Sequence, residues 1–366
     1  MRRKWRWGLL ALALLLDLVL VTQSAQATKK SKGLILDNAR QYYSVKTIKG
    51  FIRRVHAGGG TFIQLHLTDD QRYGVESKTL NQTTQNARHK GDVYYNRKTG
   101  LAFLSKKQLR SLVVYGHKRH VEVIPEIDTP GHAKALIKLL KTSSKANQKL
   151  AAQMTHKNEL NLQSAKTAPF VKKLLGEYTG LLYRGQHLAI GGDEYSSSSA
   201  ASQPNAVNYT NALNRYVNGK GLKTAMWNDG LLKADLKKID HNILVTYWSY
   251  DGETNSAKLI KQHRKVRATL PELNQAGFQT INANSWYLYV ITKPVTFKKS
   301  NVNYWKNDLR KNWNPQVWDK TYHQSLAQSS NNVGSAISIW GDGKKTYSQT
   351  QVVSKTAPFL TTYFKK

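Results

Sequence analysis

Short β-branched and aromatic runs alternate along the chain with segments whose apolar residues recur every three or four positions. The short runs predict eight strands, because each is bounded by polar or turn-forming residues. These strands cover residues 33–39, 61–67, 121–127, 188–192, 224–228, 243–249, 280–285 and 336–340. The helical spacing predicts helices that include residues 44–56, 105–118, 206–218 and 270–276.

This alternation predicts an α/β protein built from parallel βα units. Eight units in a chain of 366 residues fit a single (β/α)₈ TIM barrel over residues 28–366, with no N-terminal accessory domain ahead of it. A doubly wound open sheet is the alternative that the pattern leaves open. Two long connections interrupt the alternation. Residues 92–103 predict a β-hairpin, and residues 141–163, rich in Lys, Gln, Asn and Ser, predict a solvated flap.

Composition narrows the class of protein. The chain has no cysteine, which excludes a disulfide scaffold and thiolate metal or nucleophile chemistry. A hydrophobic fraction of 40% predicts a packed core rather than a disordered polycation. The 56 Lys and Arg against 22 Asp and Glu give a formal net charge of +34, which favours an anionic surrounding such as nucleic acid, lipid headgroups or a polyanionic cell wall.

Residues 1–27 have the pattern of a secretory signal peptide. Basic residues from Arg2 to Arg6 precede an apolar run from Leu9 to Val21, and Ala25-Gln26-Ala27 has the small-x-small form of a cleavage site. The apolar run is too short to span a bilayer comfortably, although an uncleaved anchor is an alternative. We therefore expect a secreted, extracellular protein that associates with anionic cell-wall polymers and not with nucleic acid.

Ten of the 22 acidic residues lie at or just after the carboxyl ends of the predicted strands. They are Asp37, Asp69, Asp70, Glu126, Asp128, Asp193, Glu194, Asp229, Asp251 and Asp342. Those ends open on one face of a parallel barrel, where active sites are built. Four tryptophans end strands as well: Trp227, Trp248, Trp286 and Trp340. Indole faces ringed by carboxylates suit a sugar, although each indole taken alone can equally cap the barrel core.

The pair Asp193-Glu194 follows an apolar strand and two glycines. Neighbouring side chains of a regular strand point to opposite faces, so both carboxylates can serve one site only if the backbone is distorted. Gly191-Gly192 predicts that distortion.

Near the end of the third predicted strand, His132 can orient a carboxylate and hold a proton, or be a structural histidine. Metal ligation is disfavoured because no second histidine stands at a ligand spacing, and we expect neither a metal nor a cofactor.

Six motifs resemble glycoside hydrolase family 20, the β-N-acetylhexosaminidases, and cover the chain from Gly33 to about Asp342. They are His66-Leu-Thr-Asp69-Asp70-Gln, Pro125-Glu-Ile-Asp-Thr-Pro-Gly-His132, Gly-Gly-Asp193-Glu194, Trp227-Asn-Asp229-Gly, Asn284-Ser-Trp-Tyr287-Leu-Tyr and Ser338-Ile-Trp340-Gly-Asp342. The resemblance implies a barrel that hydrolyses N-acetylhexosaminides.

The resemblance also implies a retaining, substrate-assisted mechanism. The acetamido oxygen of the substrate would attack its own anomeric carbon, while Glu194 protonates the leaving oxygen and so needs a raised pKa. Asp193 would hold the acetamido nitrogen and Tyr287 the acetamido oxygen. His132, backed by Asp69, would orient Glu194. The residues implied in sugar binding are Arg40, Trp227, Asp229, Trp248, Trp340 and Asp342.

Residues 33–40, Tyr42-Tyr-Ser and Tyr247-Trp-Ser-Tyr-Asp-Gly are similar to the branch of the family that degrades β-1,6-linked poly-N-acetylglucosamine of biofilm matrix. Asp342 departs from the usual Glu, and its shorter side chain predicts a longer or water-mediated contact with the sugar. The expected partner is an N-acetylglucosamine-containing polysaccharide. A chitobiase-like or wall-glycan hexosaminidase, a catalytically silent wall-binding lectin and a cationic envelope adhesin are the alternatives.

Overall fold

The computed structural model describes residues 30–366 except 197–199, 253, 320–326, 328 and 343–346. The chain divides into a short N-terminal unit, Met1–Lys30, and a folded unit, Ser31–Lys366. The predicted signal peptide of residues 1–27 therefore lies outside the described residues. In the described part of the chain, no helix combines the length and the apolar character needed to cross a membrane.

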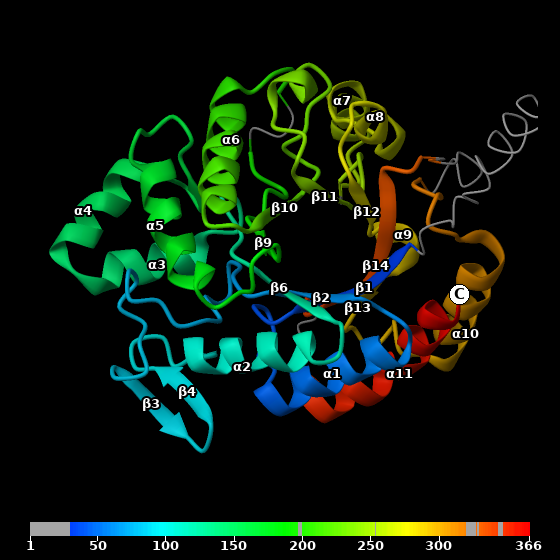
Figure 1. Cartoon of the computed structure of the whole chain (residues 1–366), viewed down its shortest axis with the longest axis horizontal. Helices are drawn as coiled ribbons and strands as arrows, with labels where there is room; N and C mark the ends of the chain where they lie inside the picture. Colours follow the sequence, from blue (N-terminus) through cyan, green and yellow to red (C-terminus); the bar gives the residue numbers. More distant parts are fainter. Residues whose placement is uncertain (1–29, 197–199, 253, 320–326, 328, 343–346) are drawn as a thin grey trace, which may run out of the picture. The chain divides into compact units, whose positions relative to one another are not determined.

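Eight parallel strands of the described residues close into a barrel (Figure 1). They are β1 (Ser31–Asp37), β2 (Phe62–His66), β6 (Glu122–Glu126), β9 (His187–Ala189), β10 (Lys223–Trp227), β11 (Leu244–Tyr247), β12 (Thr280–Asn282) and β14 (Asn332–Trp340). The first and last strands pair with each other, with Leu34 opposite Ile337. This closure excludes the open sheet and confirms the predicted (β/α)₈ barrel, in which all eight predicted strands are present.

The seventh strand of the barrel is interrupted by a turn of helix. β12 pairs with the first half of β14, and β13 (Tyr289–Ile291) pairs with its second half, both in parallel. Between them lies α9 (Ser285–Leu288), whose first amides donate to the side chain of Asn284. Because Asn284 caps this helix, the strand ends at Asn282 rather than at the predicted residue 285.

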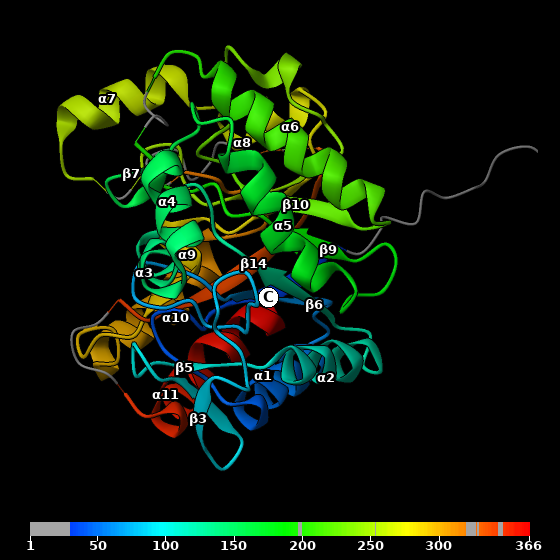
Figure 2. The ribbon, with the colours of Figure 1, turned by 90° about the vertical axis from the view of Figure 1, so that its left-hand side faces the viewer.

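Helices cover the outside of the barrel (Figure 2). The main ones are α1 (Val45–Ala57), α2 (Lys106–His117), α5 (Thr167–Thr179), α6 (Pro204–Gly219), α7 (Ala257–Val266), α8 (Leu270–Gln275), α10 (Lys299–Asn312) and α11 (Gln349–Lys365). Ser44, Ser105 and Thr269 begin three of them by accepting a hydrogen bond from a backbone amide of the first turn. The four predicted helices are confirmed to within two residues at each end.

Two insertions lengthen the connections that follow β2 and β6. After β2, the strands β3 (Ala87–Lys90), β4 (Val93–Asn96) and β5 (Ala102–Phe103) form an antiparallel sheet, which confirms the predicted hairpin. After β6, the predicted flap is wrong. The segment folds into α3 (Lys134–Ser143), α4 (Lys145–Met154) and a hairpin of β7 (Thr155–His156) and β8 (Glu159–Leu160). Ser144 caps α4, and the burial of Ala151 and Met154 in the core stabilises this otherwise polar segment.

The interior of the barrel contains small residues beside large ones. Its apolar cluster contains four alanines, one each from β9, β10 and β14 and one just after β12: Ala189, Ala225, Ala336 and Ala283. In the same cluster lie the indoles of Trp227, Trp248 and Trp340. A barrel core must be filled without voids, so small strand residues leave room for large side chains beside them. The tryptophans therefore form the floor of the barrel mouth.

Candidate active site

A cavity opens at the carboxyl ends of the barrel strands. Its lining residues are Arg40, Asp193, Glu194, Trp248, Tyr289, Trp340 and Asp342. These residues end or follow different strands, so closure of the parallel barrel brings them together from distant parts of the sequence. All of them except Tyr289 were among the site residues predicted from the sequence.

The backbone is distorted between β9 and the acid pair, as the two glycines predicted. Gly191 and Gly192 have φ values of 82° and 99°, and Glu194 has a φ of 47°, in the left-handed region. A non-glycine residue in that region carries strain of about 1–3 kcal/mol, which surrounding structure must hold in place. The distortion places the carboxylates of Asp193 and Glu194 in the same cavity.

We expect Gly191→Ala to destabilise the protein by about 2–4 kcal/mol, because an added Cβ combines backbone strain with overlap. That Cβ would lie 1.9 Å from Asp128 Oδ1 and 2.6 Å from the amide nitrogen of Thr129. Gly185→Ala is the matched control, since Gly185 has the same φ of 82° and nothing within 4 Å of the added Cβ. Denaturant unfolding of both variants measures the difference. Equal destabilisation would show that the contact with Asp128 is unimportant.

His132 lies between the two carboxylates of the acid pair. Its Nε2 is 3.5 Å from Asp193 Oδ2 and 3.5 Å from Glu194 Oε2, and its Nδ1 is 3.9 Å from Asp69 Oδ2. Burial works to lower the pKa of His132, but the nearby carboxylates, Asp193 above all, raise it to about 11. The four residues predicted to form one group therefore do so, around an imidazolium cation.

The pKa of Glu194 shifts in the direction opposite to the prediction. The close contact with His132, whose Nε2 is 3.5 Å from Glu194 Oε2, lowers this pKa, and it outweighs the burial that would raise it. The predicted raised pKa is thus wrong for the free protein, because a neighbouring imidazolium favours the carboxylate. His132 and Glu194 hold one proton between them, which remains available to a group bound beside Glu194.

Asp193 offers a hydrogen-bond acceptor to a ligand. Its Oδ1 is buried and has no hydrogen-bond partner among the described residues. Burial raises the pKa of Asp193, and it raises that of the neighbouring Asp128 well above its ordinary value. A buried acceptor without a partner is costly, so a ligand that brings an N–H to Asp193 gains a strong interaction.

Arg40 neutralises the acids on the other side of the cavity. Its guanidinium nitrogens lie 2.7 Å from Asp69, 2.8 Å from Asp342 and 3.3 Å from Asp37. The same guanidinium stands over the ring of Trp340, 5.3 Å from its centre. Asp342 is therefore held at the cavity edge by Arg40, with 35% of its side chain exposed. The length of its contact with a sugar stays a prediction.

Three of the four predicted tryptophans occupy two levels of the site, whereas Trp286 in α9 is 45% exposed and does not line the cavity. Trp248 and Trp340 line the cavity, and Tyr289 stacks on Trp248 with the ring planes 11° apart and the centres 6.1 Å apart. Trp227 is 1% exposed, and its indole N–H donates to Glu126 over 2.6 Å. Trp227 thus supports Trp340 from below, with 6.0 Å between the ring centres.

Asp229 was predicted to bind the sugar, and its placement corrects this. It is fully buried and outside the cavity lining. Its Oδ2 accepts from the indole N–H of Trp248 over 2.5 Å, and its Oδ1 lies 2.6 Å from Arg267. Burial raises the pKa of Asp229 to about 6. Asp229 therefore fixes the orientation of Trp248, and both its oxygens are used inside the protein.

Tyr287 was predicted to contact the acetamido group, but it is not among the residues that line the cavity, so this contact stays a prediction. Tyr287 lies in α9 and is buried in the outer core, where Asp308 and Tyr304 of α10 are close enough to affect its pKa. Tyr289, two residues later at the start of β13, lines the cavity instead. The intervening helical turn rotates the chain, so tyrosines that would share one face of a regular strand do not share one here.

A buried polar network that was not predicted from the sequence lies beneath the cavity. His66 Nε2 is 3.1 Å from Asp69 Oδ2, and its Nδ1 is 3.2 Å from Glu126 Oε2. Glu126 also accepts from Gln64 and Trp227. Burial opposes the charged form of His66, but Glu126 and Asp69 raise its pKa well above its ordinary value. His66 and Glu126 end the neighbouring strands β2 and β6, and this position is the sequence feature that could have indicated the network.

Two groups of three side chains have the proximity of a metal site. Asp69, Asp70 and His132 form one group and Asp128, His132 and Asp193 the other, with potential ligand atoms within 4.8 Å of one another. Both groups depend on His132, which the carboxylates keep protonated. A metal would have to displace the proton of His132, and the carboxylates that stabilise this proton oppose its loss.

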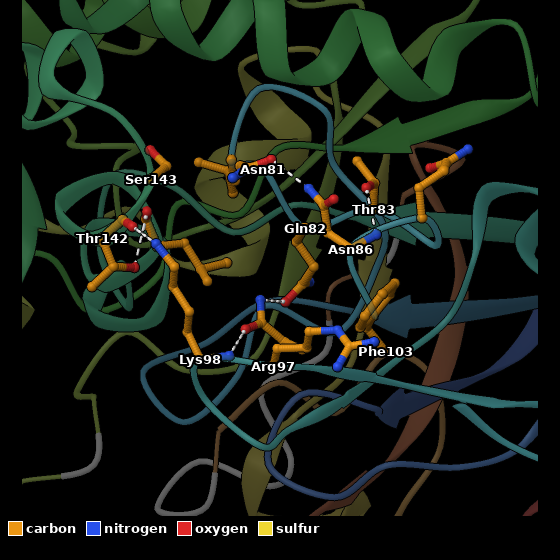
Figure 3. Close-up of a pocket in the computed structure, with 13 residues that line it drawn as sticks. Asn81, Gln82, Thr83, Asn86, Arg97, Lys98, Phe103, Thr142 and Ser143 are labelled. Carbon is orange, nitrogen blue, oxygen red and sulfur yellow. Dashed lines mark hydrogen bonds between the residues drawn. The ribbon is translucent and has the colours of Figure 1, made fainter. Parts of the chain in front are cut away.

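A second cavity lies between the hairpin insertion and the end of α3 (Figure 3). Amides and hydroxyls dominate its walls, among them Asn81, Gln82, Asn86 and Thr142, with the cations Arg97 and Lys98. Gln82 is committed to the backbone of the loop and to Asn96. The lining residues include no carboxylic acid, so this cavity lacks the acid–base groups present at the barrel mouth.

Comparison with protein families gives one match over most of the chain. Residues 30–356 match the model described as glycosyl hydrolase family 20, catalytic domain. Among solved structures, that of dispersin B superposes with a TM-score of 0.84 and 35% sequence identity, covering 92% of this chain and 99% of that one.

Curated relatives are similar over shorter stretches. A β-hexosaminidase of Vibrio furnissii is 29% identical over 187 residues, which are 48% of this chain and 30% of that protein. A lacto-N-biosidase of Bifidobacterium bifidum is 24% identical over 277 residues, which are 68% of this chain and 22% of that protein. The chain thus spans less than a third of the length of either relative.

Proposed function

Because the chain belongs to glycosyl hydrolase family 20, we propose that it is a β-N-acetylhexosaminidase that removes N-acetylglucosamine from a polysaccharide. The observation that carries this function is the group of Asp193, Glu194 and His132 beside an aromatic-walled cavity. The buried free acceptor on Asp193 matches an acetamido N–H, and the proton held between His132 and Glu194 matches a leaving oxygen. The aromatic rings match the face of a pyranose.

The proposed mechanism uses the acetamido group of the substrate as the nucleophile. Its carbonyl oxygen forms a bond to the anomeric carbon as the glycosidic bond breaks, and Glu194 gives its proton to the leaving oxygen. Asp193 accepts the acetamido N–H and stabilises the positive charge of the oxazolinium ion. A water molecule then attacks the anomeric carbon, and Glu194 takes a proton from this water. The oxazolinium ring opens and returns the acetamido group, and the anomeric carbon has its original configuration.

Hydrolysis of a chromogenic β-N-acetylglucosaminide by the purified folded chain tests the activity. We expect release of the chromophore with retention at the anomeric centre, seen by following the first-formed anomer by NMR. Binding of the sugar without turnover would support the wall-binding lectin instead. If the protein neither binds nor hydrolyses the sugar, the cationic envelope adhesin is the alternative that remains.

The hydroxyl of Tyr289 is proposed to hold the acetamido oxygen. Tyr289→Phe should therefore lower kcat/KM by about 10–100-fold, the loss expected when one hydrogen bond in a buried site is removed. Tyr287→Phe is the matched control and should change kcat/KM less than about twofold, because Tyr287 does not line the cavity. Steady-state kinetics of both variants decides between them. A larger loss of kcat/KM in Tyr287→Phe than in Tyr289→Phe would show that Tyr287 contacts the acetamido group.

His132 is proposed to keep a proton in reserve for Glu194, which predicts a change in pH dependence. His132→Gln should move the alkaline fall of kcat/KM to lower pH by at least about one unit, since the proton that His132 holds beside Glu194 in the parent is then absent. In the parent the pair retains its proton up to the raised pKa of His132, about 11. His187→Gln, whose ring contacts Glu122 away from the cavity, is the control. An unchanged profile in His132→Gln would contradict the role.

The proposed substrate is β-1,6-linked poly-N-acetylglucosamine, as the sequence motifs of this branch imply. Oligomers of N-acetylglucosamine joined by β-1,3, β-1,4 or β-1,6 bonds distinguish the possibilities when kcat/KM is measured for each. We expect the β-1,6 series to be cleaved fastest. Faster cleavage of the β-1,4 series would favour the chitobiase-like alternative.

We also propose that the protein is exported and stays near an anionic cell envelope. The signal pattern of residues 1–27 and the net charge of +34 support this location. Fractionation of the producing cell, with N-terminal sequencing of the exported protein, tests it. Export and a new N-terminus near Thr28 are expected, whereas full-length protein in the cytoplasm would contradict it.

A further inference from the structure

The outer face formed by α1 and the end of α2 carries three cations, Lys49, Arg53 and Arg119, that have no acidic partner among the described residues. The two helices lie side by side in both views (Figures 1 and 2). Lys46, Lys49 and Arg53 follow one another on α1 at spacings of three and four residues, and neither helix contains an acidic residue. Like charges at this spacing destabilise a helix. A binding partner of opposite charge would remove that cost.

Three cations of this face converge on the ring of Tyr115 in α2. Arg53 Nη1 donates to the Tyr115 hydroxyl over 3.1 Å, the Arg119 guanidinium lies 3.6 Å from the ring centre, and Lys49 Nζ lies 5.0 Å from it. The hydrogen bond from Arg53, together with the charges of Arg119 and Lys49, lowers the pKa of Tyr115. Among the described residues, no carboxylate lies within ion-pairing distance of the three cations.

We propose that Lys49, Arg53, Tyr115 and Arg119 form a binding site for the phosphates of a flexible polyol-phosphate polymer of the teichoic-acid type. A guanidinium group has five N–H donors and matches phosphate in a two-pronged geometry, and each arginine here keeps donors beyond those it uses on Tyr115. The Tyr115 hydroxyl accepts from Arg53, so its own hydrogen is left for a phosphate oxygen. The site gives a location to the envelope partner of the proposed function, on which it rests.

The shape of the face favours a flexible polymer over a rigid one. Barrel helices form a convex surface, and a chain of polyol phosphates can follow it from one helix to the next. Duplex DNA stays straight over about 150 base pairs and would touch a convex surface only along a short stretch. Binding would also leave the carboxylate-lined cavity at the strand ends open to its own substrate.

The test compares two triple variants of the full chain with the same change in net charge. Lys49→Gln/Arg53→Gln/Arg119→Gln removes the cluster, and Lys258→Gln/Lys261→Gln/Lys265→Gln removes three exposed cations of α7. Binding to purified glycerol-phosphate polymer is measured at several salt concentrations, together with hydrolysis of a short neutral N-acetylglucosaminide. We expect the cluster variant to bind at least about tenfold more weakly at low salt, with a shallower salt dependence, because fewer phosphates are neutralised.

The α7 variant should stay within about twofold of the parent, and all three proteins should hydrolyse the short substrate at the same rate. Equal weakening in the two triple variants would overturn the site and assign binding to charge spread over the whole surface. Binding of duplex DNA by the parent as tight as that of the polymer, at equal phosphate concentration, would overturn the choice of ligand. If the parent protein does not hydrolyse the short substrate, this result contradicts the proposed function and does not contradict the phosphate-binding site.

Discussion

Glu194→Gln should lower kcat on natural oligomers by about 10²–10⁴-fold, the usual contribution of a positioned general acid. The amide keeps the shape of the carboxyl group, but it cannot accept the proton that His132 holds 3.5 Å away and pass it to the leaving oxygen. KM should change much less, because the rings and Arg40, which are proposed to bind the sugar, are untouched.

A leaving group that needs no protonation provides the internal control. Glu194→Gln should recover part of its activity on a substrate with a dinitrophenolate leaving group, measured by the release of colour. Parent-like cleavage of natural oligomers would show that another group delivers the proton. Loss of activity on both substrates, with normal unfolding behaviour, would assign Glu194 a role beyond proton transfer.

Asp193→Asn should lower kcat by about 10²–10³-fold, the loss found when one preorganised electrostatic group is removed from an active site. The free and buried Oδ1 of Asp193 is proposed to interact most strongly with the charged oxazolinium ion, so turnover should fall more than substrate affinity. The measurement is steady-state kinetics with a β-N-acetylglucosaminide, in parallel with binding of a thiazoline analogue of the intermediate.

The parent should bind the thiazoline analogue much more tightly than the substrate, and Asp193→Asn should lose most of that difference. Asp128→Asn is a useful companion, since Asp128 is buried beside Asp193 but does not line the cavity. A substrate whose glucosamine nitrogen is free should resist cleavage at that sugar. Efficient cleavage of such a substrate would rule out the acetamido group as nucleophile.

The fold was predictable because the barrel strands are buried on both faces and read as apolar runs between polar turns. The same logic located Asp193, Glu194 and Asp342, since residues after parallel strands must meet at one end of the barrel, whereas Arg40 was implied only by the family resemblance. The polar segment of α3 and α4 was not predictable in this way. Its few apolar residues make a helical pair only when the barrel supplies a surface to bury them.

Other features of the site depend on contacts between distant residues. Nothing local to Asp229 shows that Arg267 and Trp248 will use both its oxygens. Nor does the sequence around Glu194 show that an imidazolium will stand beside it and lower its pKa. Tyr287 and Tyr289 differ in sequence only by their distance from Asn284, whose cap on α9 decides which ring faces the cavity.

The break in the seventh strand separates the closure of the barrel from the shape of its mouth. β12 and β13 each pair with β14 through their own hydrogen bonds, so α9 carries no part of the ladder that closes the sheet. Substitutions, insertions or exchanges within Ser285–Leu288 can therefore reshape the wall next to Tyr289 without changing the order of the strands. We expect this short helix to be a place where related enzymes diverge in substrate range, and a place where that range can be redesigned.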